Sequence, residues 1–284
     1  ATIQPHGAEV QAATLDALAQ AVRRNAPDVV VGIGGGKALD TAKGVAIRLD
    51  LPMVAVPTIA ASDAPASRGV VLYDDDHRLV AVEQMAANPV CVIVDTAMVA
   101  RAPVRFLLAG IGDAMAKKFE LASAKRRGLP NKHGAHPPIA ASAAADACYR
   151  TLIDHSAAAL AAVRAGTPDD ALEAVVEANL LLSAIAFENG GLSLAHALVH
   201  GLTTYASTSG AMHGIQVALA LLHQLAIEGP VDDVELGAMI AFYRSIGMPA
   251  SLADHGVTDR AGAIAAIAEA NLASPIVGRL FPDL

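Results

Sequence analysis

The feature that most constrains the fold is a β-branched run that leads directly into glycines. Residues 28–33 read Asp-Val-Val-Val-Gly-Ile, and three glycines follow at 34–36. A continuous apolar run of this kind is typical of a strand buried on both faces of a parallel sheet. Residues 38–49 then carry apolar side chains at helical spacing. A strand, a glycine turn and a helix in this order predict an α/β unit.

Helical and strand patterns continue to alternate through the first hundred residues. Residues 12–24 have helical spacing and end in two arginines, which suit a helix C-terminus. Further buried strands are predicted at residues 52–56, 70–73 and 90–94. These elements predict a first domain, residues 1–103, built on a parallel sheet.

The composition changes after this point. The remainder is rich in Ala, Leu and Glu, and Gly and Pro interrupt it at residues 128–130, 137–138, 166–168, 190–191 and 229–230. Helix-forming stretches separated by such breakers predict an all-helical second domain over residues 104–284.

The glycine loop is a candidate anion site. Glycines let the backbone approach a ligand closely, and the start of the helix favours negative charge, so a diphosphate is the natural ligand. A tight turn without a ligand is the alternative. Lys37 replaces the third glycine of the G-x-G-x-x-G pattern, and Val31 stands at the first glycine of a Walker loop. The loop therefore predicts a nucleotide bound in another manner.

Four side chains in the predicted second domain are candidate metal ligands. Asp113 follows Ala-Gly-Ile-Gly at the start of a predicted helix, His196 and His200 are four residues apart, and His213 opens the next apolar helix. One carboxylate with two or three imidazoles suits zinc or another divalent transition metal. Single helical histidines are more often core or surface residues, so this spacing alone leaves both interpretations open.

A polar segment, residues 56–67, follows the second predicted strand. It supplies hydroxyls and the carboxylate of Asp63. In open α/β sheets ligands bind at the carboxyl ends of strands. The alternative is an ordinary Asx-type turn before Pro65.

Bulk composition excludes several protein classes. Hydrophobic residues make up 54% of the 284 residues, yet no apolar stretch approaches the roughly 18 residues of a spanning helix. A net charge of −8 argues against nucleic acid as a partner. Two cysteines and no visible signal peptide favour a cytoplasmic location without a disulfide framework.

Taken together, the motifs resemble one known family. They resemble the glycerol dehydrogenase branch of the iron-containing (group III) alcohol dehydrogenase superfamily, in the same order along the chain and at nearly the same spacing. The matching segments are residues 32–43, 56–65, 94–96, 107–116, 194–202 and 212–214. The resemblance implies a dehydroquinate synthase-like fold, with an NAD-binding α/β domain before a helical metal- and substrate-binding domain.

The resemblance also implies cofactor contacts. The matching positions place NAD diphosphate on Gly35, Gly36 and Lys37, with Asp40 and Lys43 on the helix behind. The other positions that match cofactor-lining residues are Thr58, Ala61, Ser67, Gly69 and Tyr73.

The same comparison implies the roles of the polar site residues. Asp113, His196 and His213 match three ligands of a catalytic metal that also binds substrate, with zinc expected and Fe²⁺ or another divalent ion as the alternative. Asp63 matches an aspartate that binds a substrate hydroxyl. His200 matches no ligand of this branch. Its spacing from His196 resembles that in iron-type relatives, in which a second histidine stands near the nicotinamide. The catalytic candidates are therefore Asp63 and His200.

Three departures from the family pattern stand out. Lys117 occupies the position of a fourth ligand in iron-type enzymes, which favours a three-ligand site. Arg68 stands where a small or apolar residue is usual beside the cofactor. The family begins with a longer segment containing a first strand, and it continues beyond the last residues seen here. The chain is therefore expected to be either a fragment or a shortened paralogue with impaired NAD binding.

The function implied is NAD-dependent oxidation of glycerol, a vicinal diol, to dihydroxyacetone. The resemblance implies a homo-oligomer, often an octamer in this family. The expected partner is a small polyol substrate, with neither nucleic acid nor membrane bound. One alternative keeps the fold and changes the substrate to 1,2-propanediol, a 2-hydroxy acid or a sugar phosphate. Another is a catalytically silent, nucleotide-binding oligomeric protein.

Overall fold

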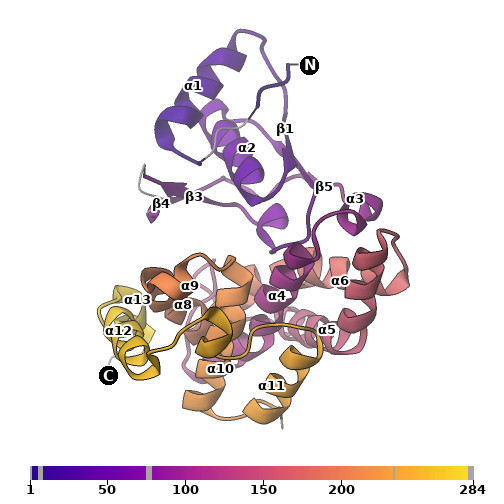
Figure 1. The fold of residues 1–284 in the computed structure, drawn as a ribbon. Helices are drawn as coiled ribbons and strands as arrows, with labels where there is room; N and C mark the ends of the chain where they lie inside the picture. The colour runs from indigo at the N-terminus through magenta and orange to yellow at the C-terminus, as the bar shows by residue number, and fades with distance from the viewer. Residues whose placement is uncertain (1, 6–8, 75–78, 233, 281–284) are drawn as a thin grey trace.

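A computed structural model of the protein describes residues 2–5, 9–74, 79–232 and 234–280. A part containing the strands lies above a larger helical part, and β5 and α3 lie where the two meet (Figure 1). The elements of the upper part are α1 (Ala12–Arg23), β1 (Val30–Gly34), α2 (Gly36–Leu49), β2 (Met53–Pro57), the 3₁₀ turn η1 (Ala64–Ala66), β3 (Gly69–Tyr73), β4 (Leu79–Gln84), β5 (Cys91–Val92) and α3 (Thr96–Ala100).

A parallel sheet in the order β1-β2-β5 forms the centre of this part. Helix α2 packs on it, and Gly32 permits the close approach because a Cβ there would collide with the side chains of Ala42 and Met53. Leu39 and Ala46 of α2 join Met53 and other strand residues in a buried cluster. The predicted strand, glycine turn and helix are thus confirmed.

The predicted strand at residues 70–73 exists, but it lies outside the parallel sheet. β3 pairs antiparallel with β4, a strand that the sequence analysis did not predict. A parallel pairing requires a long crossover, usually a helix. Residues 58–68 contain only the short 3₁₀ turn, so β3 pairs with the strand that follows it.

The prediction that residues 28–33 are buried on both faces is wrong. Val31 is 51% exposed and Ile33 is 62% exposed, whereas Gly32 between them is buried. The reason is that α2 covers one face of β1, and among the described residues no second layer covers the other. Successive strand residues point to opposite faces, so exposure alternates along the strand.

The regular elements of the lower part are helical, and the predicted glycines and prolines fall at breaks between them, although further breaks at residues 205, 210–212, 246–251, 256–259 and 273–274 were not predicted. Its elements are α4 (Val104–Arg126), α5 (Ile139–Ala165), α6 (Asp170–Glu177), the π-helical turn η2 (Ala178–Leu182), α7 (Ser183–Gly190), α8 (Leu194–Thr204), α9 (Ala206–Ser209), α10 (His213–Glu228), α11 (Leu236–Ser245), the 3₁₀ turn η3 (Leu252–His255), α12 (Arg260–Leu272) and α13 (Pro275–Leu280). One large apolar cluster joins α4, α5, α6, α8, α10, α11 and α12, and a smaller cluster joins α4, α5 and α7. Among the described residues, no helix combines the length and apolar character needed to cross a membrane.

Glycines in the middle of α4 allow it to cross α10 at very short range. A Cβ at Gly112 would collide with the carbonyl of Gly214, and a Cβ at Gly214 would collide with the carbonyl of Ala109. Asp113 therefore lies in the middle of α4, and the prediction that it begins a helix is wrong. The glycines before it serve helix packing, and the crossing brings Asp113 beside the first residue of α10, His213.

Candidate active site

The structure brings together three of the predicted ligands from three helices. Asp113 comes from α4, His196 from α8 and His213 from α10. One ligand atom from each lies within 4.8 Å of the others. Asp113 is buried, His196 is half-buried and His213 is exposed, so the group is closed on the α4 side and open at His213.

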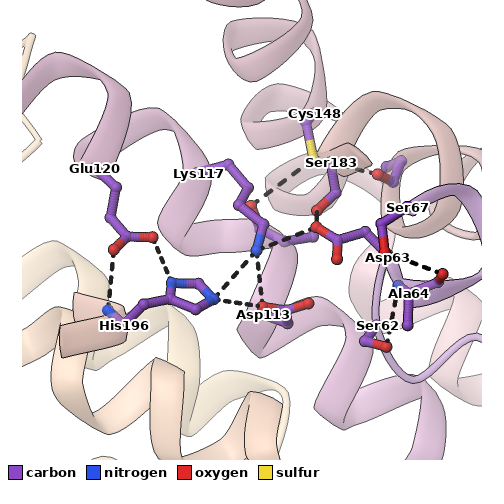
Figure 2. Close-up of polar contacts among 12 residues, drawn as sticks. Ser62, Asp63, Ala64, Ser67, Asp113, Lys117, Glu120, Cys148, Ser183 and His196 are labelled. Atoms are coloured by element: carbon purple, nitrogen blue, oxygen red, sulfur yellow. Dashed lines mark hydrogen bonds and ion pairs between the residues drawn. The ribbon is translucent and has the colours of Figure 1, made fainter. Parts of the chain in front are cut away.

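Lys117 lies one turn after Asp113 and points into the same group (Figure 2). Its Nζ is 2.8 Å from Oδ1 of Asp113 and 3.2 Å from Oδ2 of Asp63. Burial by itself would raise the pKa of Asp113, but the Lys117 ammonium holds this pKa well below its usual range. Burial opposes the charge of Lys117 too, but its carboxylate neighbours raise its pKa above the ordinary value.

His196 is held between two carboxylates. Its Nδ1 is 2.6 Å from Oε2 of Glu120, and its Nε2 is 3.2 Å from Oδ1 of Asp113. Burial alone would lower the pKa of His196, but the charge of Glu120 and the hydrogen bond to Asp113 raise it to about 9. Glu120 was not singled out from the sequence. Its spacing of seven residues from Asp113 places both on one face of α4, which is the signal that could have identified it.

The other two candidate histidines, His213 and His200, differ in position. The His213 ring centroid lies 5.4 Å from that of His196. His200 lies one turn after His196 on α8, as predicted from the spacing, but its side chain is exposed and it is not part of the ligand group. Its catalytic role stays a prediction.

Asp63 reaches the group from the loop after β2. It is buried, and its Oδ2 accepts a hydrogen bond of 2.9 Å from the Ser183 hydroxyl (Figure 2). Ser183 follows the π-helical turn η2, a type of irregularity that is frequent at functional sites. Asn179 within that turn donates to the carbonyl of Ala60. Two polar side chains of the helical part therefore hold the loop in place, and neither was identified from the sequence.

The predicted nucleotide loop is built for a close backbone approach. Gly35 precedes α2 and provides no side-chain cap for the first N–H groups of that helix. A Cβ at Gly36 would meet nothing within 4 Å, so packing within the protein does not require glycine there. A shallow pocket joins the two glycines to the loop after β2, and its lining residues are Gly35, Gly36, Leu39, Ile59, Ala61, Ser62 and Pro65.

Two predicted cofactor residues have partners within the protein. Lys37 is 56% exposed and pairs with Glu9. Asp40 accepts from the backbone N–H of Val71 and from Lys43. Burial raises the pKa of Asp40, against the lowering effect of Lys43.

Lys43 itself is fully buried and donates to the carbonyls of Ala64, at 2.6 Å, and Gly69, at 3.1 Å. Lys43 and Asp40 thus fasten the loop and β3 to α2. Both side chains already use polar atoms in hydrogen bonds within the protein.

The other predicted cofactor positions surround this arrangement. Thr58 donates its N–H to the carbonyl of Gly34, and the Ser67 hydroxyl donates to the carbonyl of Ala64. Tyr73 is half-buried at the end of β3. The backbone N–H of Arg68 donates to Glu188 of α7, which makes another link between the loop and the helical part.

The donor set fits a divalent transition metal. Two imidazoles and a carboxylate suit zinc. A metal-binding histidine commonly donates its other ring nitrogen to a carboxylate, and His196 has this arrangement with Glu120. The fit therefore rests on the three donors and on the carboxylate behind one of them.

Comparisons with known proteins agree with this architecture. A family model described as iron-containing alcohol dehydrogenase matches residues 1–103. A glycerol dehydrogenase of Pseudomonas putida is 42% identical over 86% of this chain and 67% of its own length. A glycolaldehyde reductase of Halobacterium salinarum is also 42% identical, over 82% of this chain and 63% of its own.

A solved structure is similar as well. The crystal structure of a probable glycerol dehydrogenase from Sinorhizobium meliloti 1021 superposes with a TM-score of 0.89 at 39% identity, covering 97% of this chain and 78% of that one. The chain thus spans between 63% and 78% of the lengths of these three relatives. Sequence identity at this level over most of the chain shows that it belongs to the iron-containing alcohol dehydrogenase family.

Proposed function

We propose that the chain carries the catalytic centre of an NAD-dependent, metal-dependent dehydrogenase that oxidises glycerol to dihydroxyacetone. The observation that carries this proposal is the position of a single loop, residues 58–67. Its residues Ile59, Ala61 and Ser62 line the pocket beside the glycines, while its Asp63 pairs with Lys117, which in turn pairs with the predicted ligand Asp113. One segment thus borders both the dinucleotide pocket and the metal ligands.

The reaction converts glycerol and NAD⁺ into dihydroxyacetone, NADH and a proton. A divalent metal on Asp113, His196 and His213 supplies Lewis-acid polarisation of the substrate hydroxyl when bound. NAD⁺ held beside Gly35 and Gly36 would supply the hydride acceptor. Among the residues of this chain, Asp63 accepts a hydrogen bond from a substrate hydroxyl and orients the diol. Ser183 and Lys117 hold that carboxylate in position.

Zinc is the metal that the donor set favours. Lys117 fills the position of a fourth ligand, and its ammonium is a hydrogen-bond donor that cannot coordinate a cation while protonated. The nearby carboxylates favour its protonated form, because they raise its pKa above the ordinary value in the metal-free protein. A site of three protein ligands with an open position suits catalytic zinc.

The position of Lys117 also bears on the substrate class. Both close partners of its ammonium, Asp63 and Asp113, are carboxylates of the protein itself and lie within 3.2 Å. It therefore gives no support to a phosphate- or carboxylate-bearing substrate. An uncharged diol, or the uncharged aldehyde that the name of the Halobacterium salinarum relative indicates for that protein, suits the group better.

The test is a set of steady-state assays on the purified chain. After chelator treatment, NADH formation from glycerol should be lost, and it should return with zinc more fully than with Fe²⁺. Glycerol and 1,2-propanediol should exceed lactate and glycerol phosphate in kcat/KM, and NADH-dependent reduction of glycolaldehyde is measured in parallel. Activity that is indifferent to chelation would refute the metal role. NAD binding without any turnover would favour the silent alternative.

Assembly and location belong to the proposal as well. The family resemblance implies a homo-oligomer, of which an octamer is one form, and the low cysteine content favours a cytoplasmic location. The exposed apolar side chains of Val31, Ile33, Val90 and Ile93 are compatible with association through the sheet. Light scattering on the purified chain tests the oligomeric state.

A further inference from the structure

Glu120 is a charged side chain in the helical core that the proposed reaction does not itself use. It lies two turns after Asp113 on α4 and is fully buried. Burying a carboxylate is costly unless hydrogen bonds compensate it. The contacts of Glu120 therefore indicate what it is for.

One oxygen of Glu120 holds the start of α8. Oε1 accepts from the backbone N–H of Ser193 and from that of His196, both at 2.9 Å. Ser193, at the N-cap position, makes no side-chain cap, and its hydroxyl has no partner among the described residues. Glu120 thus satisfies helix-terminal N–H groups that the local sequence leaves open.

The other oxygen holds the ring of His196. Oε2 lies 2.6 Å from Nδ1, and an ionised carboxylate can only accept. Nδ1 must therefore carry the hydrogen, which leaves the lone pair of the neutral ring on Nε2. That nitrogen faces Asp113 Oδ1 at 3.2 Å and Lys117 Nζ at 3.4 Å.

We propose that Glu120 is a positioning residue that fixes the tautomer and orientation of His196, and so sets the affinity of the Asp113–His196–His213 group for a divalent cation. The two oxygens act together, because one anchors the backbone of His196 while the other anchors its ring. This inference rests on the metal role in the proposed function. Its test measures the protonation of the His196 ring separately from metal binding.

The decisive variant is Glu120→Gln. Its amide oxygen can still accept from the two backbone N–H groups, so the cap is retained. Its amide NH₂ then faces Nδ1, which must become an acceptor, and the ring hydrogen moves to Nε2. Zinc affinity, measured by competition with a chromophoric chelator, should fall about 10- to 100-fold.

Glu228→Gln is the matched control. Glu228 is likewise a buried carboxylate at a helix end, and it accepts from Ser123 and Arg127 without touching His196. The Glu228→Gln variant should bind zinc as tightly as the unmodified chain. A Glu120→Gln protein that binds zinc as tightly as this control would overturn the proposal.

Nitrogen-15 NMR of His196 gives a reading that a purely structural cap would not change. In the chelator-treated, unmodified chain at alkaline pH, the ring should be protonated at Nδ1, and in Glu120→Gln at Nε2. Protonation at Nε2 in the unmodified chain would sink the inference, whether or not Glu120→Gln folds. If the unmodified chain bound no zinc while its ring was protonated at Nδ1, the proposed function would fail and the assignment of Glu120 to the ring would stand.

Discussion

Nζ of Lys117 lies 2.8 Å from Oδ1 of Asp113, one turn away on α4, and both side chains are only 2% exposed. The same ammonium lies 3.2 Å from Asp63, which comes from the loop after β2. One lysine therefore links a candidate metal ligand in the helical part to a candidate substrate contact in the part that contains the strands.

Replacing Lys117 should destabilise the metal-free protein strongly. Lys117→Met leaves two buried carboxylates without their cation, and breaking a buried pair in this way costs about 3–5 kcal/mol. The free energy of unfolding in urea, after chelator treatment, measures the loss. Lys118→Met is the control, because Lys118 pairs with the more exposed Asp146 and Asp232 and should cost about 1 kcal/mol or less. Equal losses in the two variants would contradict the role of Lys117.

The stability of the chelator-treated protein should fall as the pH rises from about 6.5 to about 9. His196 has a pKa of about 9 when folded, above the ordinary value of 6.5. A raised pKa stabilises the folded protein by its full amount at pH values below the pKa of the unfolded state. This stabilisation, here about 3 kcal/mol, is lost as the pH rises through the pKa of the folded state. Urea unfolding across this range measures it, and His196→Gln should remove most of the slope. A flat profile in the unmodified protein would count against the charged imidazole.

The close crossing of α4 and α10 should tolerate no added methyl group. In Gly214→Ala the new Cβ would overlap the carbonyl of Ala109, so the helices must separate at a cost of about 1–3 kcal/mol. Since Asp113 and His213 flank this crossing, zinc affinity should fall with stability. Gly237→Ala is the matched control: that Cβ meets nothing within 4 Å on α11, so it should stabilise by about 0.5–1 kcal/mol. A neutral Gly214→Ala would mean that the crossing is looser than described.

Removing the Ser183 hydroxyl should weaken substrate binding and leave metal binding unchanged. Ser183→Ala deletes a donor to the buried carboxylate of Asp63, a charged hydrogen bond worth about 1.5–3 kcal/mol. The KM for glycerol should rise about tenfold or more, with zinc affinity unaltered. Ser156→Ala, which removes a buried hydroxyl bonded within its own helix α5, provides the comparison. If zinc affinity fell with KM, Asp63 would belong to the metal set instead of to the substrate.

A methyl group at Gly36 should impair NAD binding without affecting folding. Nothing lies within 4 Å of a Cβ built there, so Gly36→Ala leaves the protein's own packing intact. A bound diphosphate approaching the start of α2 would meet that methyl group. Calorimetric titration should show NAD affinity at least about tenfold weaker, equivalent to about 1.4 kcal/mol. Unchanged affinity would place the diphosphate elsewhere.

Features set by neighbouring residues were predicted well from the sequence. The strand, glycine turn and helix around β1 and α2, and the breaks between the later helices, depend on local propensity and spacing. The motifs indicated the family and the two-part fold, which the family match and the similar structure confirm. The gathering of Asp113, His196 and His213 was anticipated only through the family resemblance, since spacing alone left it open.

Several features could not be anticipated because they depend on packing between distant segments. Asp113 lies in mid-helix because Gly112 packs against α10, a contact about a hundred residues away in the chain. The antiparallel pairing of β3 depends on which strand lies beside it, and the exposure of Ile33 depends on which elements cover β1. Local hydrophobic periodicity gives no information on such contacts between distant segments.

The chain's local pattern thus determined the strands of the parallel sheet, most of the long helices and the candidate ligands, because hydrophobic spacing and helix breakers act between near neighbours. The tertiary structure alone decided which polar groups support those ligands. Ser183 behind Asp63 carries no distinctive local signal. The spacing of Lys117 and Glu120 from Asp113 indicates a shared face of α4, but it does not indicate that Lys117 pairs with Asp63 or that Glu120 pairs with His196. Their roles arise only when the packing of α4, α7 and α8 buries their charges and hydroxyls together, where each polar group must find a partner.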